Sequence, residues 1–115
     1  MGTDRSLLSG DMALLVLELL REGDLYGYEM TEALEKRSEN AFRLKAGTLY
    51  PLLHAMERAD WVESYEGNSA AGKPRRYYRL TEAGRAALEE KKRAWTTYAA
   101  AMRHVLGGEE HVPEP

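Results

Sequence analysis

The sequence has no cysteine, no long apolar run and no excess of positive charge, and each absence narrows the range of functions. Without cysteine there is no disulfide, no thiolate zinc site, no cysteine nucleophile and no thiol redox sensor. No apolar stretch approaches the roughly 18 residues that span a bilayer. Residues 1–10 lack the basic-then-apolar order of a signal peptide. We therefore expect a cytoplasmic protein that has no membrane partner.

The net charge of −3 seems to argue against nucleic acid as a partner, but the charge is unevenly distributed. Residues 1–42 have a balance of −5 and residues 81–115 a balance of −1, whereas residues 43–80 have a balance of +3. Screening limits charge effects to roughly 10 Å, so a local cationic surface matters more to a phosphate than the total charge does. The middle third of the chain is therefore the candidate for phosphate binding.

Apolar periodicity predicts a mainly α fold with a small β-hairpin, in a chain long enough for one domain. The first helix is expected to begin at the capping residues Ser9 and Asp11 and to end before Gly23. It is apolar nearly all round, which predicts that it is the most buried helix. Asp24 is a candidate cap for a second helix that reaches Arg37.

A third helix is expected over residues 46–58, with Pro51 near its start. If Thr48 is the cap, proline costs little there; if the helix begins earlier, one hydrogen bond is lost. Residues 61–65 and 75–80 alternate as strands do, with turn-forming residues 67–74 between them, so we expect a hairpin with a flexible tip. An inward Leu80 places Tyr78 in the core.

A fourth helix is expected to begin at Thr81 and Glu82 and to stop before Gly107. At 1.5 Å per residue it would be about 39 Å long, more than one small domain needs. The remaining residues, 108–115, are acidic and contain proline, which predicts a disordered tail.

Three helices followed by a hairpin are the order of a winged helix-turn-helix domain, which we assign to residues 1–80, with residues 81–107 as a dimerisation helix. The third helix of such a domain fits the major groove of DNA, and the hairpin tip reaches the neighbouring backbone or minor groove. The polar and cationic residues at these two places are the DNA-binding candidates: Arg43, Lys45, Thr48, Tyr50, His54, Lys73, Arg75 and Arg76.

The candidates on the third helix each have a plainer structural explanation. Arg43 and Lys45 either contact phosphates or are ordinary solvated cations. Thr48 either contacts bases or is only the cap of its helix. Tyr50 either packs against the second helix or donates to a phosphate, and His54 is either in the groove or simply exposed.

Apolar residues of the fourth helix recur with the spacing of a coiled-coil seam; they are Leu88, Trp95, Ala99, Met102 and Leu106. A domain this small cannot cover so long a stripe, so we expect a two-fold homodimer. Near the dimer axis, Trp95 is either interface packing alone or one wall of a slot for a flat aromatic effector. The expected lining of that slot is Trp95, Met102, Met12 and Leu15.

Three motifs in order resemble one family over residues 7–106. They are LYGYE at residues 25–29, GTLYPLL at residues 47–53 followed by ME at 56–57, and GKPRRYYRLTEAG at residues 72–84. This pattern resembles the PadR family of phenolic-acid-responsive repressors and their relatives, in its short subfamily with a single C-terminal helix.

The resemblance implies a winged helix-turn-helix dimer on operator DNA near genes for detoxification, drug efflux or stress response. It implies a repressor that a planar aromatic or phenolic effector releases. We expect no cofactor. The positions that match the family's DNA-facing residues are Lys45, Thr48, Tyr50, His54, Lys73, Arg75 and Arg76.

Two other classes of function compete with this interpretation. An enzyme needs a positioned nucleophile, an acid–base pair or a metal, and His54, His104 and His111 have no metal-ligand spacing. We therefore expect neither an enzyme nor a metal site. The remaining alternative is a winged-helix adaptor that binds only proteins, which would have no need of a cationic hairpin.

Overall fold

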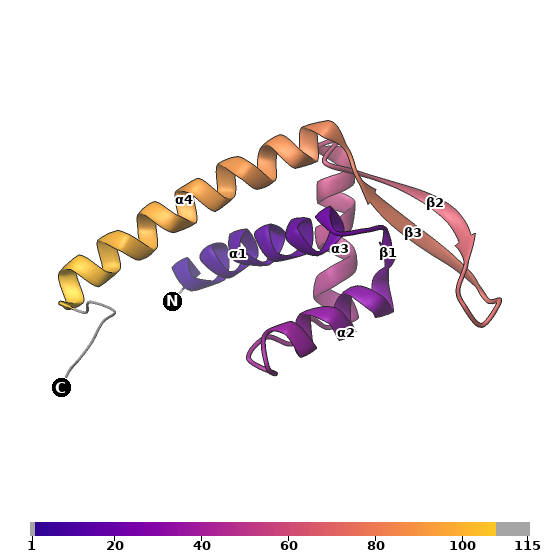
Figure 1. Ribbon diagram of the computed structural model, residues 1–115, viewed down its shortest axis with the longest axis horizontal. Coiled ribbons are helices and arrows are strands. Elements are labelled where there is room, and N and C mark those ends of the chain that lie inside the picture. The colour runs from indigo at the N-terminus through magenta and orange to yellow at the C-terminus, as the bar shows by residue number, and fades with distance from the viewer. Residues whose placement is uncertain (1, 108–115) are drawn as a thin grey trace.

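The computed structural model describes residues 2–107, with side chains from residue 12 onward. In chain order the elements are α1 (Gly2–Arg21), β1 (Leu25–Tyr26), α2 (Gly27–Arg37), α3 (Ala46–Arg58), β2 (Val62–Asn68), β3 (Pro74–Leu80) and α4 (Glu82–Leu106). Figure 1 shows the β2–β3 hairpin projecting from one side of the helical body, while α4 runs beside α1 toward the other side. The predicted fold class is confirmed. The predicted tail, residues 108–115, lies outside the described residues.

The core is built around α1, as its apolar composition predicts. Val16 and Leu17 have no exposed surface, and they belong to the same cluster as Met30 of α2 and Leu53 of α3, which are equally buried. Complete burial of such side chains contributes roughly 1.5–3 kcal/mol each. The other large residues that are nearly or fully buried include Leu44, Leu49, Met56, Val62, Tyr78 and Leu88. Within residues 2–107, no helix is long and apolar enough to cross a membrane.

The sheet is antiparallel, in the order β1-β3-β2. The register pairs Val62 with Leu80 and Ser64 with Tyr78. Tyr78 is 2% exposed, so the inward direction predicted for it is confirmed. The hairpin turn is closed by a backbone hydrogen bond from Ser69 N–H to the Lys73 carbonyl, and the Ser69 hydroxyl accepts a hydrogen bond from Lys73 N–H. The sequence did not indicate β1, because a strand of two residues has no periodicity.

The starts of the first two helices differ from the predictions, whereas α3 has the bounds predicted for it. Ser9 and Asp11 lie inside α1, which begins at Gly2, because the residues before Ser9 include no proline that would break a helix. Asp24 does not cap α2; its carboxylate instead accepts a hydrogen bond of 2.6 Å from the Tyr65 hydroxyl. The N-cap of α2 is Tyr26, whose backbone N–H donates to Glu29 Oε1 at 3.1 Å.

The cap of α3 is Lys45 rather than Thr48, so the helix begins earlier than a Thr48 cap would require. Pro51 is therefore inside the helix, and the bond to the carbonyl of Gly47 is missing because proline has no N–H. The boundaries predicted for the fourth helix are confirmed. The Thr81 hydroxyl caps it by accepting from Gly84 N–H, and Gly107 ends it with a φ of 75°.

Candidate nucleic-acid interface

The outer face of α3 is exposed and mostly polar. Leu49, Leu53 and Met56 bury the opposite face, so the helix is fixed to the core along its length. Thr48 and His54 are exposed. The exposed side chains at the start and middle of the helix are therefore accessible, and a helix exposed in this way can enter the major groove of DNA.

The first turn of α3 is positioned by a contact between Tyr50 and Gly27. A Cβ on Gly27, the first residue of α2, would overlap the Tyr50 hydroxyl, so only glycine allows this approach. Tyr50 still exposes 41% of its surface. It packs against the second helix, and its outer edge remains accessible to solvent.

A hollow of about 490 Å³ lies between α2 and the start of α3. Arg43, Lys45 and Tyr50 are on its lining. Arg43 Nε lies 3.5 Å from Glu35 Oε2, with 67% of the arginine side chain exposed, which makes this a weak surface ion pair. Among the side chains that the structure describes, Lys45 forms no ion pair.

The wing, residues 62–80, places its predicted DNA-binding residues in three different environments. Lys73 is exposed at the tip, where it too forms no ion pair with the described residues. The Arg75 guanidinium lies over the Tyr26 ring, 5.2 Å from its centroid. Arg76 is turned to the other face of the sheet, where it contacts Ser64 at 2.8 Å and Glu66 at 3.4 Å.

Three tyrosine rings stiffen the solvent-facing side of the wing. Tyr26 and Tyr77 meet edge to face at 5.4 Å, and Tyr77 stacks on Tyr65 at 5.7 Å. The hydrogen bond to Asp24 raises the pKa of Tyr65. Each such aromatic pair contributes about 0.5–1.5 kcal/mol beyond the burial of its area. The hairpin is thus attached firmly to the segment that precedes α2.

The second half of α4 carries most of the predicted dimerisation residues, and it is exposed. Trp95, Met102 and Leu106 are 51%, 42% and 74% exposed, and Ala99 is half-buried. Leu88 corrects the prediction: it is 1% exposed and lies in the core of its own chain. The reason is that the N-terminal part of the α4 stripe packs on the protein's own core, so spacing alone misassigned it.

A slot of about 290 Å³ between α1 and α4 includes two of the four predicted effector residues, Leu15 and Trp95. The full lining is Leu14, Leu15, Glu18, Phe42, Lys92 and Trp95. Met12 and Met102 are not on it; Met12 packs against the core. The sequence analysis missed Phe42, although a signal was present, because it is the sole phenylalanine of the chain and stands in a polar break.

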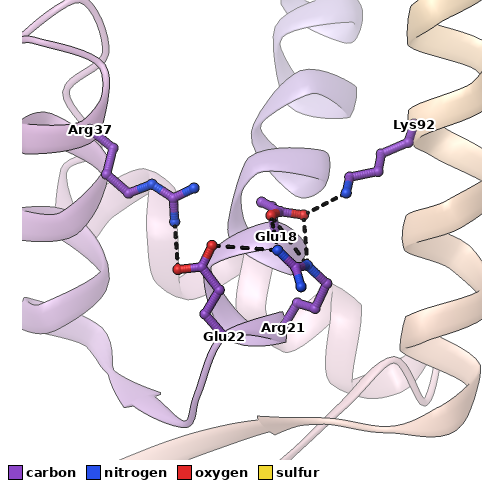
Figure 2. A network of polar contacts seen from close by, with 5 residues as sticks. All are labelled: Glu18, Arg21, Glu22, Arg37 and Lys92. Atoms are coloured by element: carbon purple, nitrogen blue, oxygen red, sulfur yellow. Dashed lines mark hydrogen bonds and ion pairs between the residues drawn. The ribbon is translucent and has the colours of Figure 1, made fainter.

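An ion-pair network holds the helices around this slot, as Figure 2 shows. Glu18 accepts from Arg21 at 2.7 Å and from Lys92 of α4 at 3.0 Å. The hydrogen bonds to Arg21 and then Lys92 outweigh partial desolvation, and they lower the pKa of Glu18 from 4.5 to about 2. Glu22 continues the network to Arg37 of α2 at 3.1 Å. Three helices are thus connected through one carboxylate of α1, that of Glu18, and one directly after it, that of Glu22.

Comparison with known proteins agrees with this architecture. A model of the transcriptional regulator PadR-like family matches residues 16–90. Transcriptional regulator Rv3488 of Mycobacterium tuberculosis is 41% identical over 96 residues, which cover 84% of this chain and 83% of that protein.

Two solved structures are similar over most of the chain. A PadR family transcription regulator of Clostridium difficile is 38% identical with a TM-score of 0.70, covering 82% of this chain and 96% of that one. A transcriptional regulator of Clostridium thermocellum is 27% identical with a TM-score of 0.78, covering 86% and 93%. Members of this family are regulators rather than enzymes, which confirms the prediction that the protein is not an enzyme. The family match, the sequence identity and the shared fold together establish that the chain belongs to the PadR-like family of transcriptional regulators.

Proposed function

We propose that the protein is a dimeric repressor that binds operator DNA, with α3 in the major groove and the wing tip on the neighbouring backbone. The observation that supports this most directly is the orientation of α3, whose apolar face is buried while Thr48 and His54 are exposed. A regulator of this kind works where the DNA is, which makes the cytoplasm its proposed location.

The cations divide by how readily they can exchange partners. Lys45 and Lys73 are exposed and unpaired among the described residues, so we assign them to phosphates. Arg43 can exchange its long contact with Glu35 for a phosphate at little cost, because exposed pairs are worth about 0–1 kcal/mol. Arg75 retains its place on the Tyr26 ring and presents its remaining donors to the backbone.

The uncharged candidates on α3 have two roles in this proposal. Thr48 and His54 are on the exposed side, and we assign them to base edges. Tyr50 mainly sets the approach of α3 to α2 through Gly27, while its exposed edge contacts a phosphate.

The exposed part of α4 supports a homodimer. Trp95, Tyr98, Met102, Val105 and Leu106 are large apolar residues that this half of the helix leaves between 42% and 84% exposed. Residues of this size in one contiguous stretch mark an interaction surface. A second copy of α4 covers it by two-fold symmetry, which also suits paired half-sites about one helical turn apart on DNA.

The slot beside Trp95 supports a small planar effector. Most of its lining is apolar, from Leu14, Leu15, Phe42 and Trp95, and the two polar lining residues, Glu18 and Lys92, are paired with each other. Its volume of about 290 Å³ is at the lower end of ligand pockets. We therefore propose a flat aromatic compound of one or two rings as the ligand that releases the repressor. The slot sits between the α2–α3 loop, through Phe42, and α4, through Trp95, so it can influence both DNA binding and dimerisation.

A gel-shift titration tests the DNA-binding proposal. The purified protein is titrated against duplex DNA from just upstream of its own gene and against a scrambled duplex of equal length. We expect selective, salt-sensitive binding, with Lys73→Ala lowering the slope of log affinity against log salt by about 0.9. Lys36→Ala, which removes the same charge from the last turn of α2, is the matched control and should leave the slope unchanged. Failure on both duplexes at low salt would favour the protein-binding adaptor instead.

Fluorescence tests the effector site. In a Trp61→Phe background, Trp95 is the one remaining tryptophan, so quenching by planar aromatic compounds reports on the slot directly. We expect saturable quenching that Leu15→Ala weakens, whereas Met12→Ala, outside the slot, has little effect. If compounds displace the protein from DNA equally well in a Trp95→Ala variant, the effector binds elsewhere.

A further inference from the structure

Arg76 lies on the face of the wing that is joined to α3, the helix proposed to read the DNA, and 54% of its side chain is exposed. Alternation along β3 places it on the same face of the sheet as Tyr78 and Leu80, which are buried. The register pairs Arg76 with Glu66 and pairs Tyr78 with Ser64, so Arg76 lies just beyond the core on the inner face of the hairpin.

Ser64 connects Arg76 to α3. Its hydroxyl oxygen accepts from Arg76 Nη1 at 2.8 Å, and the same hydroxyl donates to Oε2 of Glu57 at 2.9 Å. Glu57 is in the last turns of α3. A hydroxyl can accept and donate at once, so a single half-buried serine joins a cation on the wing to an anion on the reading helix.

A second contact, with Glu66, is a weak surface ion pair whose side chains are 54% and 73% exposed, so the bond to Ser64 is the main restraint on the arginine. Arg76 Nη2 lies 3.4 Å from Glu66 Oε2, its cross-strand partner on β2. The guanidinium therefore uses both of its terminal nitrogens, one toward β2 and one toward α3 through Ser64. A lysine has one donor nitrogen instead of a planar fork, so it cannot reproduce an arrangement in which two different nitrogens contact the two partners.

The outer face of the wing is attached to a different element. Tyr65 and Tyr77 stack on each other, Tyr77 meets Tyr26, and Tyr65 donates to Asp24 just before α2. The base of the wing is thus held toward α2 on one face and toward α3 on the other. Of the two attachments, the Arg76–Ser64–Glu57 relay is the one that reaches the helix proposed to enter the groove.

We propose that Arg76 is a positioning residue of the DNA interface, which fixes the angle between the wing and α3 through Ser64 and Glu57 and does not itself bind phosphate. This inference rests on the DNA binding proposed above. It changes the role that the sequence motif suggested for Arg76, because the guanidinium is already engaged on the inner face. Correct spacing of the wing and α3 matters most for an operator that both must fit, and less for non-specific DNA.

The proposal predicts that substituting the uncharged Ser64 and substituting the charged Arg76 reduce DNA selectivity to the same extent. Fluorescence anisotropy is measured on a duplex that the wild-type protein enriches from a random pool, and on a scrambled duplex of equal length. Arg76→Lys and Ser64→Ala should each reduce the preference for the enriched duplex by about fivefold, the equivalent of one net hydrogen bond. The double variant should be no worse than either single variant, since both remove the same relay.

Two controls separate position from charge. Arg79→Ala removes an arginine from the same strand on the opposite face, where it pairs with Glu63, and it should leave the preference unchanged. Lys73→Ala should lower the salt slope on the scrambled duplex by about 0.9, whereas Arg76→Lys and Ser64→Ala should not change it. If Ser64→Ala is neutral and Arg76→Ala lowers the slope as Lys73→Ala does, Arg76 contacts phosphate and the proposal is wrong.

A measurement without DNA keeps this inference separate from the proposed function. The chain has no cysteine, so Ala55→Cys on α3 and Ala70→Cys in the hairpin turn give a unique pair of spin-label sites, both exposed. The distance distribution between the labels should broaden in Arg76→Lys and in Ser64→Ala but not in Arg79→Ala. Unchanged distributions would overturn the relay. A wild-type protein that binds neither duplex would overturn the DNA function, while the label distances would still decide whether the relay sets the angle.

Discussion

Replacing Glu18 by glutamine should weaken the attachment of α4 to α1 in a way that depends on pH. Glu18 is the only described carboxylate that contacts Lys92, and it also binds Arg21 at 2.7 Å (Figure 2). These bonds lower its pKa from 4.5 to about 2. Glutamine keeps the shape of the side chain and removes its charge, so the comparison isolates the electrostatic contribution.

The magnitude follows from the pKa and from the exposure of the partners. A fall from 4.5 to about 2 corresponds to roughly 3 kcal/mol for a pair shielded from solvent. Arg21 and Lys92 are 40% and 44% exposed, however, so screening by water leaves about 1 kcal/mol. Because the pKa is lower in the folded state, this stabilisation is complete above about pH 4.5 and is lost as the pH falls toward 2.

Urea unfolding at about pH 7, 5 and 3 measures the difference between the two proteins. We expect Glu18→Gln to lower the free energy of unfolding by about 1 kcal/mol at the two higher pH values and by less at the lowest. Glu22→Gln, directly after the end of α1 and 48% exposed, is the matched control and should cost no more than about 0.5 kcal/mol. A Glu18→Gln deficit that is the same at every pH would show that packing, and not charge, is responsible.

Four further substitutions test other parts of the structure. Gly27→Ala should displace the Tyr50 ring from α2 and weaken DNA binding, while costing less than about 1 kcal/mol in urea unfolding, because the ring is 41% exposed and can move toward solvent. Leu88→Ala should cost about 2–5 kcal/mol, because this residue is in the core of the chain itself. Val105→Glu, at a position 84% exposed, should leave unfolding of the protomer nearly unchanged and shift sedimentation toward the monomer. Tyr65→Phe should cost about 1 kcal/mol by removing its bond to Asp24.

The elements that sequence analysis predicted well are those with a long regular pattern. The end of α3 and both ends of α4 were predicted from their apolar periodicity and capping residues. The alternation of residues along the strand correctly predicted that Tyr78 is buried. The elements it missed depend on contacts between distant residues. Asp24 looks like a helix cap, yet its carboxylate is bound to Tyr65, which lies 41 residues away in the sequence.

The candidate site shows the same division. Leu88 and Trp95 follow one spacing, but Leu88 is 1% exposed and Trp95 is 51% exposed, because α4 leaves the protein's own core between them. A heptad-like pattern predicts that the apolar side chains are buried, but it does not say whether they pack against the same chain or against a partner. Arg76 was grouped with the wing cations by composition, whereas its contact with Ser64 depends on the register of β2 against β3, which residue types alone do not determine.

The joint between α3 and α4 has a consequence for regulation. The Thr81 hydroxyl donates to the carbonyl of Asp60, and the Thr81 N–H donates to the carbonyl of Trp61, directly after α3 ends. Gly84 packs so closely on the Trp61 carbonyl that a Cβ would overlap it. The first turn of α4 therefore cannot rotate without moving the end of α3. The exposed half of the same helix is the proposed dimer surface. In such a dimer, a change of angle between the two copies of α4 would reach the end of α3 through this joint.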